Sequence, residues 1–314
     1  MKPVRRLGTF LAAAGVACAA AISGCAAGTT VATDSPRPAT TALLAHFTQT
    51  DLPISAYELA APQAGQEEYL TKRLQQLCMA RFAFNYLPGL SASEVSRDAR
   101  TIQEIESRRY GVSDPQAVRT YGYEMPAWTM GSTSPVTLGS LPESVRSVLL
   151  GTAASYHGRS VPAGGCVAEA QQELAQIGIS ATVQQSGGQD VSDVAAEIRS
   201  DGFQRAQSDP RVLKAFTRWS ACMSAHGYSY ATPTDAGADP RWPSSGPADA
   251  AEIQTAEQDL ACKQQVNLIG VEVAVESDYE NAAIAQNAQA MQQAKADVAS
   301  ATAAFGRAMA EYGG

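Results

Sequence analysis

The sequence predicts a mainly α-helical fold, a disulfide-stapled helical domain that ends in a long C-terminal helix. Three observations favour this fold class. Apolar residues recur at helical spacing in several segments, and no alternating strand pattern with turn signals recurs. Residues 249–312 contain no proline and only two glycines, Gly270 and Gly306. Aromatic residues make up only 7% of the chain, while alanine is abundant, which favours helices that pack through small side chains.

The domain is expected to begin with an apolar lead-in over 41–62 and to continue in helices. An amphipathic helix is predicted over 66–84, a second helix over 91–109, and a new helix start at Asp114-Pro115. The apolar face of the first helix comprises Leu70, Leu74, Leu77, Cys78 and Phe82.

The middle of the chain is expected to alternate loops and short helices. A loop packed by its own aromatic rings is predicted over 121–128, and short helices are predicted over 141–150, 166–176 and 190–201.

A further helix has clear signals at both ends. Asp209 offers a side-chain acceptor, and Pro210 suits the first helical position. Gly227 is a natural left-handed residue at the other end. The stretch 231–248 holds four prolines and two glycines, which predicts a loop.

The C-terminal segment 249–312 is predicted to be one very long helix, or two helices with a break near Gly270. Within 276–314 a coiled-coil-like seam repeats every seven residues. It comprises Ile284, Met291, Val298, Phe305 and Tyr312, flanked by Ala294, Ala301 and Ala308. Two interpretations stay open: the seam meets a protein partner, or this helix folds back on its own domain.

Residues 1–24 have the three parts of an export signal. A positive start (Lys2, Arg5, Arg6) precedes an apolar run over 10–22, and the run Ile22-Ser23-Gly24-Cys25 reads as a lipobox. Cys25 is therefore the predicted lipidation site, and its acyl chains would hold the protein at the outer face of the membrane. The competing interpretations are an ordinary secretory signal and a twin-arginine signal.

The remainder of the chain divides into a flexible tether, 25–40, and an extracytoplasmic domain, 41–314. The whole chain has 23 basic and 31 acidic residues. Removal of the three basic residues of the signal gives a net charge of −11. Such a surface repels nucleic acid, so no nucleic-acid partner is expected.

Four cysteines remain after Cys18 in the signal and Cys25: Cys78, Cys166, Cys222 and Cys262. An even number in an exported protein predicts two disulfides. A zinc site is the alternative, but the wide gaps contain no Cys-x-x-Cys and no nearby His-x₃-His. No metal and no cofactor are therefore expected.

Local sequence favours one of the three possible pairings. Cys78 and Cys222 are each followed by Met, by two aromatic residues six and eight positions on, and then by proline. Cys166 and Cys262 each begin a glutamine-rich helical stretch. This pattern suggests a degenerate duplication, 66–176 and 208–275, in which Cys78 pairs with Cys166 and Cys222 with Cys262.

Candidate catalytic residues are few. The sequence has no nucleophile elbow, metalloprotease, phosphate-binding or dinucleotide-binding motif. His226 is expected to cap the helix that carries Cys222 rather than to act in catalysis. Acidic and basic residues interleave over 91–109, with Glu104 and Arg108 at favourable spacing, which predicts a solvated, ion-paired face.

Two weaker possibilities also stay open. His157 lies near Ser155 and Ser160, but a third group would be needed for a catalytic arrangement. Tyr228 and Tyr230, together with Trp242, could line an aromatic groove, although core or loop packing is the simpler expectation.

A set of motifs resembles the secreted lipoproteins of Streptomyces-type actinobacteria, over about residues 43–312. The motifs are Leu52-Pro53-Ile54-x-x-Tyr57, Cys78-Met79-x₂-Phe82-x-Phe84, Gly165-Cys166-x₂-Glu169-Ala170, Trp219-Ser220-Ala221-Cys222-Met223, Gly227-Tyr228-x-Tyr230 and Asp259-x₂-Cys262-Lys263. The resemblance implies an exported lipoprotein and brings no biochemical activity with it. Phe82-Ala83 stands where the second unit has His226-Gly227, so the first helix end lacks the glycine cap.

These observations predict a non-enzymatic binding or structural protein of the cell envelope. Its expected partners are the membrane, through Cys25, and a protein at the C-terminal helix. An accessory subunit of an exporter or envelope assembly system is the alternative, and a cell-wall hydrolase is a further one.

Overall fold

The computed structural model describes residues 41–85, 92–130, 138–179, 191–243 and 246–313. The predicted signal peptide, Cys25 and the whole of the predicted tether lie outside these residues. The described part contains eleven α-helices and one two-stranded hairpin, β1 (Ser155–Tyr156) and β2 (Arg159–Ser160). The predicted mainly α-helical fold is therefore confirmed.

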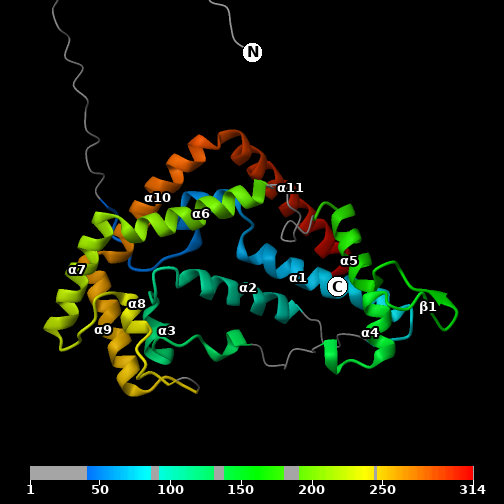
Figure 1. The fold of residues 1–314 in the computed structure, drawn as a ribbon, viewed down its shortest axis with the longest axis horizontal. Helices are drawn as coiled ribbons and strands as arrows, with labels where there is room; N and C mark the ends of the chain where they lie inside the picture. The colour runs from blue at the N-terminus through cyan, green and yellow to red at the C-terminus, as the bar shows by residue number, and fades with distance from the viewer. Residues whose placement is uncertain (1–40, 86–91, 131–137, 180–190, 244–245, 314) are drawn as a thin grey trace, which may run out of the picture. The chain divides into compact units, whose positions relative to one another are not determined.

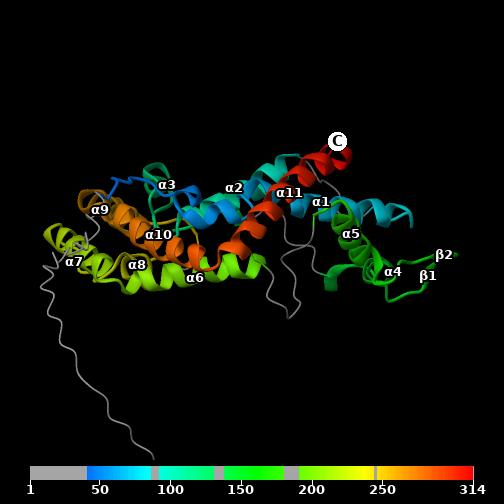
Figure 2. The same cartoon turned by 90° about the horizontal axis from the view of Figure 1, so that it is seen from above.

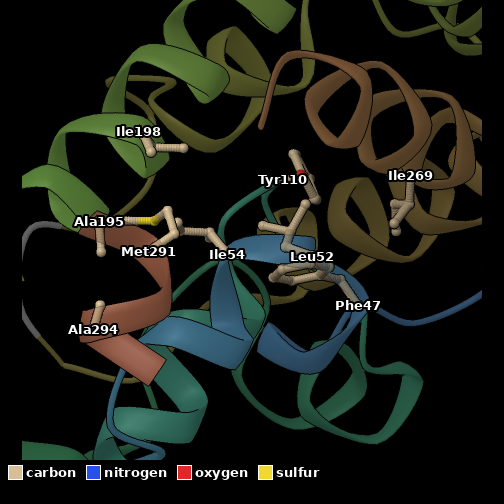
Figure 3. Packing of buried hydrophobic residues seen from close by; sticks show 9 residues of the cluster. All are labelled: Phe47, Leu52, Ile54, Tyr110, Ala195, Ile198, Ile269, Met291 and Ala294. Carbon is tan, nitrogen blue, oxygen red and sulfur yellow. The ribbon is translucent and has the colours of Figure 1, made fainter. Parts of the chain in front are cut away.

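The apolar lead-in forms two 3₁₀ turns, η1 (Gln49–Asp51) and η2 (Pro53–Tyr57). Phe47, Leu52 and Ile54 from this segment are buried in one cluster with side chains of α6, α10 and α11. Figure 3 shows Ile54 beside Met291 of α11, with Phe47 close to Leu52. The lead-in is thus a strap that joins helices from distant parts of the sequence.

Helix α1 (Ala61–Ala80) begins five residues earlier than the predicted start because Pro62 occupies its first turn, where the missing N–H costs nothing. Leu70, Leu74 and Cys78 are buried as expected, and α1 packs on α2, α5 and α11. Leu77, placed on the same apolar face by the sequence, is 40% exposed, so that assignment is wrong.

The next elements are α2 (Ala92–Ser107), α3 (Pro115–Tyr121), η3 (Ala127–Met130), η4 (Leu138–Ser140), α4 (Glu143–Leu150) and α5 (Gly165–Gln176). Asp114 caps α3, since its Oδ1 accepts hydrogen bonds from the backbone N–H of Gln116 at 2.6 Å and of Ala117 at 3.0 Å. The predicted aromatic loop over 121–128 therefore begins at the end of a helix and includes the start of η3.

Helix α6 (Val191–Ser208) runs seven residues beyond its predicted end. It is followed by α7 (Pro210–Ala225), where Asp209 is the N-cap, as predicted: its Oδ1 accepts from the Arg211 N–H at 2.8 Å. The predicted loop 231–248 contains a short helix, α8 (Pro233–Gly237), capped by Thr232.

The C-terminal segment forms three helices, α9 (Ala250–Val266), α10 (Leu268–Gln286) and α11 (Ala288–Tyr312). The first break lies at Asn267, which adopts a left-handed backbone with φ of 53°. Gly270 does not form the break but lies buried inside α10. A glycine is needed there because a Cβ would lie 2.3 Å from the carbonyl oxygen of Ala42. The second break, at Asn287, was not predicted.

The apolar seam of α11 packs within the chain. Met291 and Ala294 lie in the cluster of the lead-in, while Phe305 and Ala308 lie in a cluster with α1 and α5. Of the two interpretations left open by the sequence, the structure therefore shows the helix folded back on its own domain. Figure 2 shows α11 crossing the region of α1.

Two disulfides join helices that are distant in sequence. Cys78 of α1 bonds to Cys166 of α5, and Cys222 of α7 bonds to Cys262 of α9, with Cα–Cα distances of 5.6 and 5.7 Å. This is the pairing that the local sequence favours. The duplication from which the pairing was argued stays a prediction.

The two helix ends beside these disulfides have the same hydrogen bonds. The Phe84 N–H donates to the Met79 carbonyl at 3.2 Å, and the Tyr228 N–H donates to the Met223 carbonyl at 3.0 Å. The residue before each donor has positive φ, 60° at Ala83 and 87° at Gly227. Ala83 therefore adopts the conformation that normally calls for glycine.

Among the described helices, none combines the length and the apolar character needed to cross a membrane.

Candidate functional site

A cavity of about 370 Å³ lies where α6, α7, α9 and α10 meet the segment 108–112 and α8. Its lining combines aromatic rings with buried charged groups. The helices around it are fixed to one another: α10 packs on α6 and α7, and the Cys222–Cys262 disulfide joins α7 to α9. Figure 1 shows α6 and α10 side by side above α9.

A buried ion pair forms one wall of the cavity. Asp259 and Lys263 stand four residues apart on α9, both side chains are fully buried, and Lys263 Nζ lies 3.1 Å from Asp259 Oδ2. The other Asp259 oxygen accepts from the Trp219 indole N–H at 2.9 Å, and Lys263 also donates to the Val112 carbonyl at 3.1 Å. Burial raises the pKa of Asp259, while Lys263 and Trp219 oppose that shift.

Glu272 of α10 is a second buried carboxyl group at the cavity. Its side chain is 3% exposed, and its Oε1 accepts from Gln207 Nε2 of α6 at 3.0 Å. Its Oε2 has no hydrogen-bond partner among the described residues. Burial raises the pKa of Glu272 to about 8. Such an unmatched buried oxygen is uncommon in native proteins and calls for an explanation.

One turn further along α10, Glu276 is fully buried, and both oxygens of its carboxylate accept hydrogen bonds. Arg109 Nε donates to its Oε1 at 2.9 Å, and the Tyr110 hydroxyl donates to its Oε2 at 2.6 Å. Burial and the Glu276 carboxylate raise the pKa of the Tyr110 hydroxyl, which therefore remains a proton donor. The next carboxyl, Glu280, accepts from the Ile54 N–H at 3.1 Å.

Aromatic side chains cover the apolar part of the cavity. They come from Tyr123, Phe203 and Phe216. The Arg109 guanidinium lies over the Phe203 ring, 4.7 Å from its centroid. The Tyr123 hydroxyl is buried, and burial together with the nearby Asp259 raises its pKa. Gly237 of α8 faces the Tyr123 ring, since a Cβ at Gly237 would lie 3.5 Å from it.

The charged stretch 91–109 differs in part from its prediction. Glu104 and Arg108 form the predicted ion pair, with Arg108 Nε 2.8 Å from Glu104 Oε1. Both are largely buried, however, and Arg108 also donates to the Tyr123 and Glu124 carbonyls. The end of the stretch is therefore not a solvated face: Arg108 is largely buried and holds the backbone of Tyr123 and Glu124 beside the cavity.

The histidines take structural positions. His226 Nδ1 lies 2.9 Å from the Cys222 carbonyl, which confirms the predicted capping contact. Within the described residues, the group with metal-ligating geometry is Cys222, His226 and Cys262, but its two sulfur atoms are bonded to each other. His157 adopts a positive φ in the β1–β2 turn and packs edge-on against Tyr156.

The aromatic groove suggested by Tyr228, Tyr230 and Trp242 does exist: all three side chains line a second cavity of about 450 Å³. The Tyr230 hydroxyl donates to Asp239 at 2.6 Å, and Arg241 donates to that hydroxyl at 2.7 Å. Tyr230, Asp239 and Arg241 of this groove thus satisfy one another.

Most residues of the first cavity were missed by sequence reasoning. The sequence contained one signal for this cavity: Asp259 and Lys263 both belong to the motif Asp259-x₂-Cys262-Lys263, to which the sequence alone assigns no functional role. Glu272 and Gln207 gave no local signal, because each side chain becomes a site residue only when α6 packs on α10.

Comparisons with known proteins add no relative: no family model, no curated protein and no solved structure matches the chain.

Proposed function

We propose that this chain is a lipid-anchored binding protein at the outer face of the cytoplasmic membrane, without enzymatic activity, and that it holds a small ligand in the cavity between α6, α7, α9 and α10. The observation that carries the proposal is the buried oxygen of Glu272 that has no hydrogen-bond partner among the described residues, on a side chain that lines a cavity with aromatic walls. A buried polar atom in such a position is explained if a ligand completes its hydrogen bonding.

Support for the location comes from the sequence and from the cysteines. The lipobox at Cys25 is expected to anchor the chain, and disulfides are typical of the oxidising side of a membrane. The resemblance to actinobacterial lipoproteins is consistent with this proposal.

A binding role fits the site better than proton transfer does. Asp259 and Lys263 hold each other, and Glu276 is held by Arg109 and Tyr110. Groups fixed in this way give a rigid frame that positions a ligand. A protein partner at the C-terminal helix also stays a proposal, and it would have to contact the exposed side of α11 because the seam lies in the protein's own core.

The test uses a substitution that fills the cavity. In Gly237→Leu, a bulky side chain would be added at the cavity lining, with its Cβ in ordinary contact with the Tyr123 ring that lines the same cavity. Gly306→Leu on α11 is the matched control, because nothing lies within 4 Å of a Cβ there. A small-molecule fragment library is screened by ligand-observed NMR against the full-length protein in detergent.

Fragments that bind the unmodified protein and Gly306→Leu but not Gly237→Leu would support the proposal. A screen that finds none, or fragments that bind all three proteins equally, would contradict a ligand site in this cavity.

A further inference from the structure

The charges around the cavity leave one carboxyl group without a cation. Arg108 is paired with Glu104, Arg109 with Glu276, and Lys263 with Asp259. Each cation that lines the cavity therefore already has its own carboxylate. Glu272 is the remaining acidic group, and in the described part of the chain its Oε1 is held by the neutral amide of Gln207 while its Oε2 has no partner.

We propose that the ligand of this cavity is an organic monocation, a protonated amine on a compact apolar body, and that Glu272 anchors its ammonium group. The inference rests on the proposed binding function and specifies the ligand class. An ammonium group would donate to the free Oε2, and its positive charge would pair with the one carboxyl that lacks a cation. A buried carboxylate without a counter-charge is costly, and the ligand would remove that cost.

The walls of the cavity fit the apolar body of such a ligand. Phe216, Phe203 and Tyr123 offer ring surfaces, and a volume of about 370 Å³ is that of a small-molecule site. A bare divalent cation fits poorly, because Ca²⁺ and Mg²⁺ need about six or more oxygen ligands and the Lys263 ammonium lines the same cavity. An anionic ligand would be repelled by the Glu272 carboxylate, and each cation that lines the cavity is already paired with a carboxylate of the protein.

Binding of the cation would be coupled to release of a proton. Burial raises the pKa of Glu272 to about 8, so the carboxyl is mostly protonated at neutral pH. The groups that act on it are Gln207 of α6, Asp259 and Lys263 of α9, and Glu276 of α10. The Gln207 amide and Lys263 lower its pKa, while Glu276 and Asp259 raise it. The amine must displace the proton, so its affinity should rise as the pH rises towards about 8.

Isothermal titration with three probes of similar shape tests the ligand class: benzylammonium, neutral benzyl alcohol and anionic benzoate. The proteins are the full-length chain in detergent, Glu272→Gln, and the control Glu280→Gln, whose buried carboxyl lies outside the cavity lining. Benzylammonium is expected to bind most tightly. Its affinity should rise about tenfold per pH unit between about pH 6 and about pH 7.5, with release of about one proton.

Glu272→Gln should weaken benzylammonium binding by about 10- to 100-fold and remove the pH dependence, while Glu280→Gln keeps both. Benzyl alcohol or benzoate binding as tightly as benzylammonium would overturn the cationic class while leaving the binding function in place. Amine binding that ignores both pH and Glu272→Gln would overturn the role of Glu272. Failure of all three probes, when the fragment screen has found cavity ligands, would also reject the class; an empty fragment screen would instead reject the binding function itself.

Discussion

Replacing Ala83 by glycine is expected to stabilise the protein by about 0.5–1 kcal/mol. Ala83 follows the end of the first disulfide-bearing helix with φ of 60°, a conformation in which the Cβ of an L-residue approaches the following carbonyl oxygen. Its side chain is exposed, so removal of the methyl group sacrifices little buried surface. Relief of the left-handed backbone is therefore the main effect.

The magnitude follows from two opposing contributions. An L-residue in the left-handed region costs roughly 1–2 kcal/mol relative to glycine. Glycine in turn gives the unfolded chain more freedom, which costs about 0.4–1 kcal/mol. The second helix end provides the reverse experiment, since Gly227 has φ of 87° and nothing lies within 4 Å of a Cβ built there. Gly227→Ala should thus destabilise by about the same amount for the same reason.

Urea unfolding of the oxidised protein measures both effects, because a shift of midpoint at constant slope reports a change in stability. Ala83→Gly should raise the midpoint, Gly227→Ala should lower it, and the double variant should lie close to the unmodified protein because the two sites belong to different disulfide-linked helix pairs. If Ala83→Gly lowers the midpoint while Gly227→Ala is neutral, the left-handed backbone does not carry the same conformational cost at the two helix ends.

Three further outcomes are expected. The free energy of unfolding of the unliganded protein should fall as the pH rises from about 5 to about 8, because Glu272 keeps its proton in the folded state and loses it in the unfolded state. Glu272→Gln should reduce this pH dependence by up to about 1.4 kcal/mol per pH unit. A profile of urea midpoint against pH that the substitution leaves unchanged would contradict the raised pKa of Glu272. Lys263→Met should lower the free energy of unfolding in urea by about 3–5 kcal/mol, because it leaves the buried Asp259 carboxylate without its cation. Adding Asp259→Asn to that variant should recover part of the loss. No recovery would mean that the unpaired charge of Asp259 is not the cause of the loss. Cys25→Ser should abolish palmitate labelling and move the protein from the membrane to the soluble fraction, and a variant still held at the membrane would refute lipid anchoring.

Local sequence signals predicted the helices well where they depend on caps and spacing. Asp114 and Asp209 are followed by proline and cap helices as expected, and the cysteine contexts favoured the pairing that the structure has. The break at Asn267 lies close to Gly270, where the sequence offered a break as one of two possibilities, but the break at Asn287 was harder to foresee because no proline or glycine marks it. Asparagine is one of the few residue types that tolerate the left-handed region, so Asn267 itself is the local signal for the exact position of the first break.

The candidate site was nearly invisible in the sequence for a different reason. Glu272, Glu276 and Glu280 recur every four residues on α10, a spacing that is typical of a solvated helix face. All three are nevertheless buried, because their partners are contributed by remote elements: Gln207 by α6, Arg109 by the segment after α2, and Ile54 by the lead-in. Periodicity identifies a polar stripe, but only tertiary packing decides whether that stripe meets water or other polar groups.

The difference among these three carboxyl groups is what connects the fold to its proposed function. Glu276 has a cation and two donors, and Glu280 holds the backbone of the lead-in, so both secure α10 in the core. Glu272 and Glu280 each keep one buried oxygen without a hydrogen-bond partner among the described residues, but of the two only Glu272 lines the cavity. A carboxyl group retained for stability alone would be better replaced by an apolar residue of similar size. Its position instead suits a group whose last hydrogen bond and counter-charge arrive with a ligand, so Glu272→Leu should stabilise the unliganded protein in urea while it abolishes benzylammonium binding.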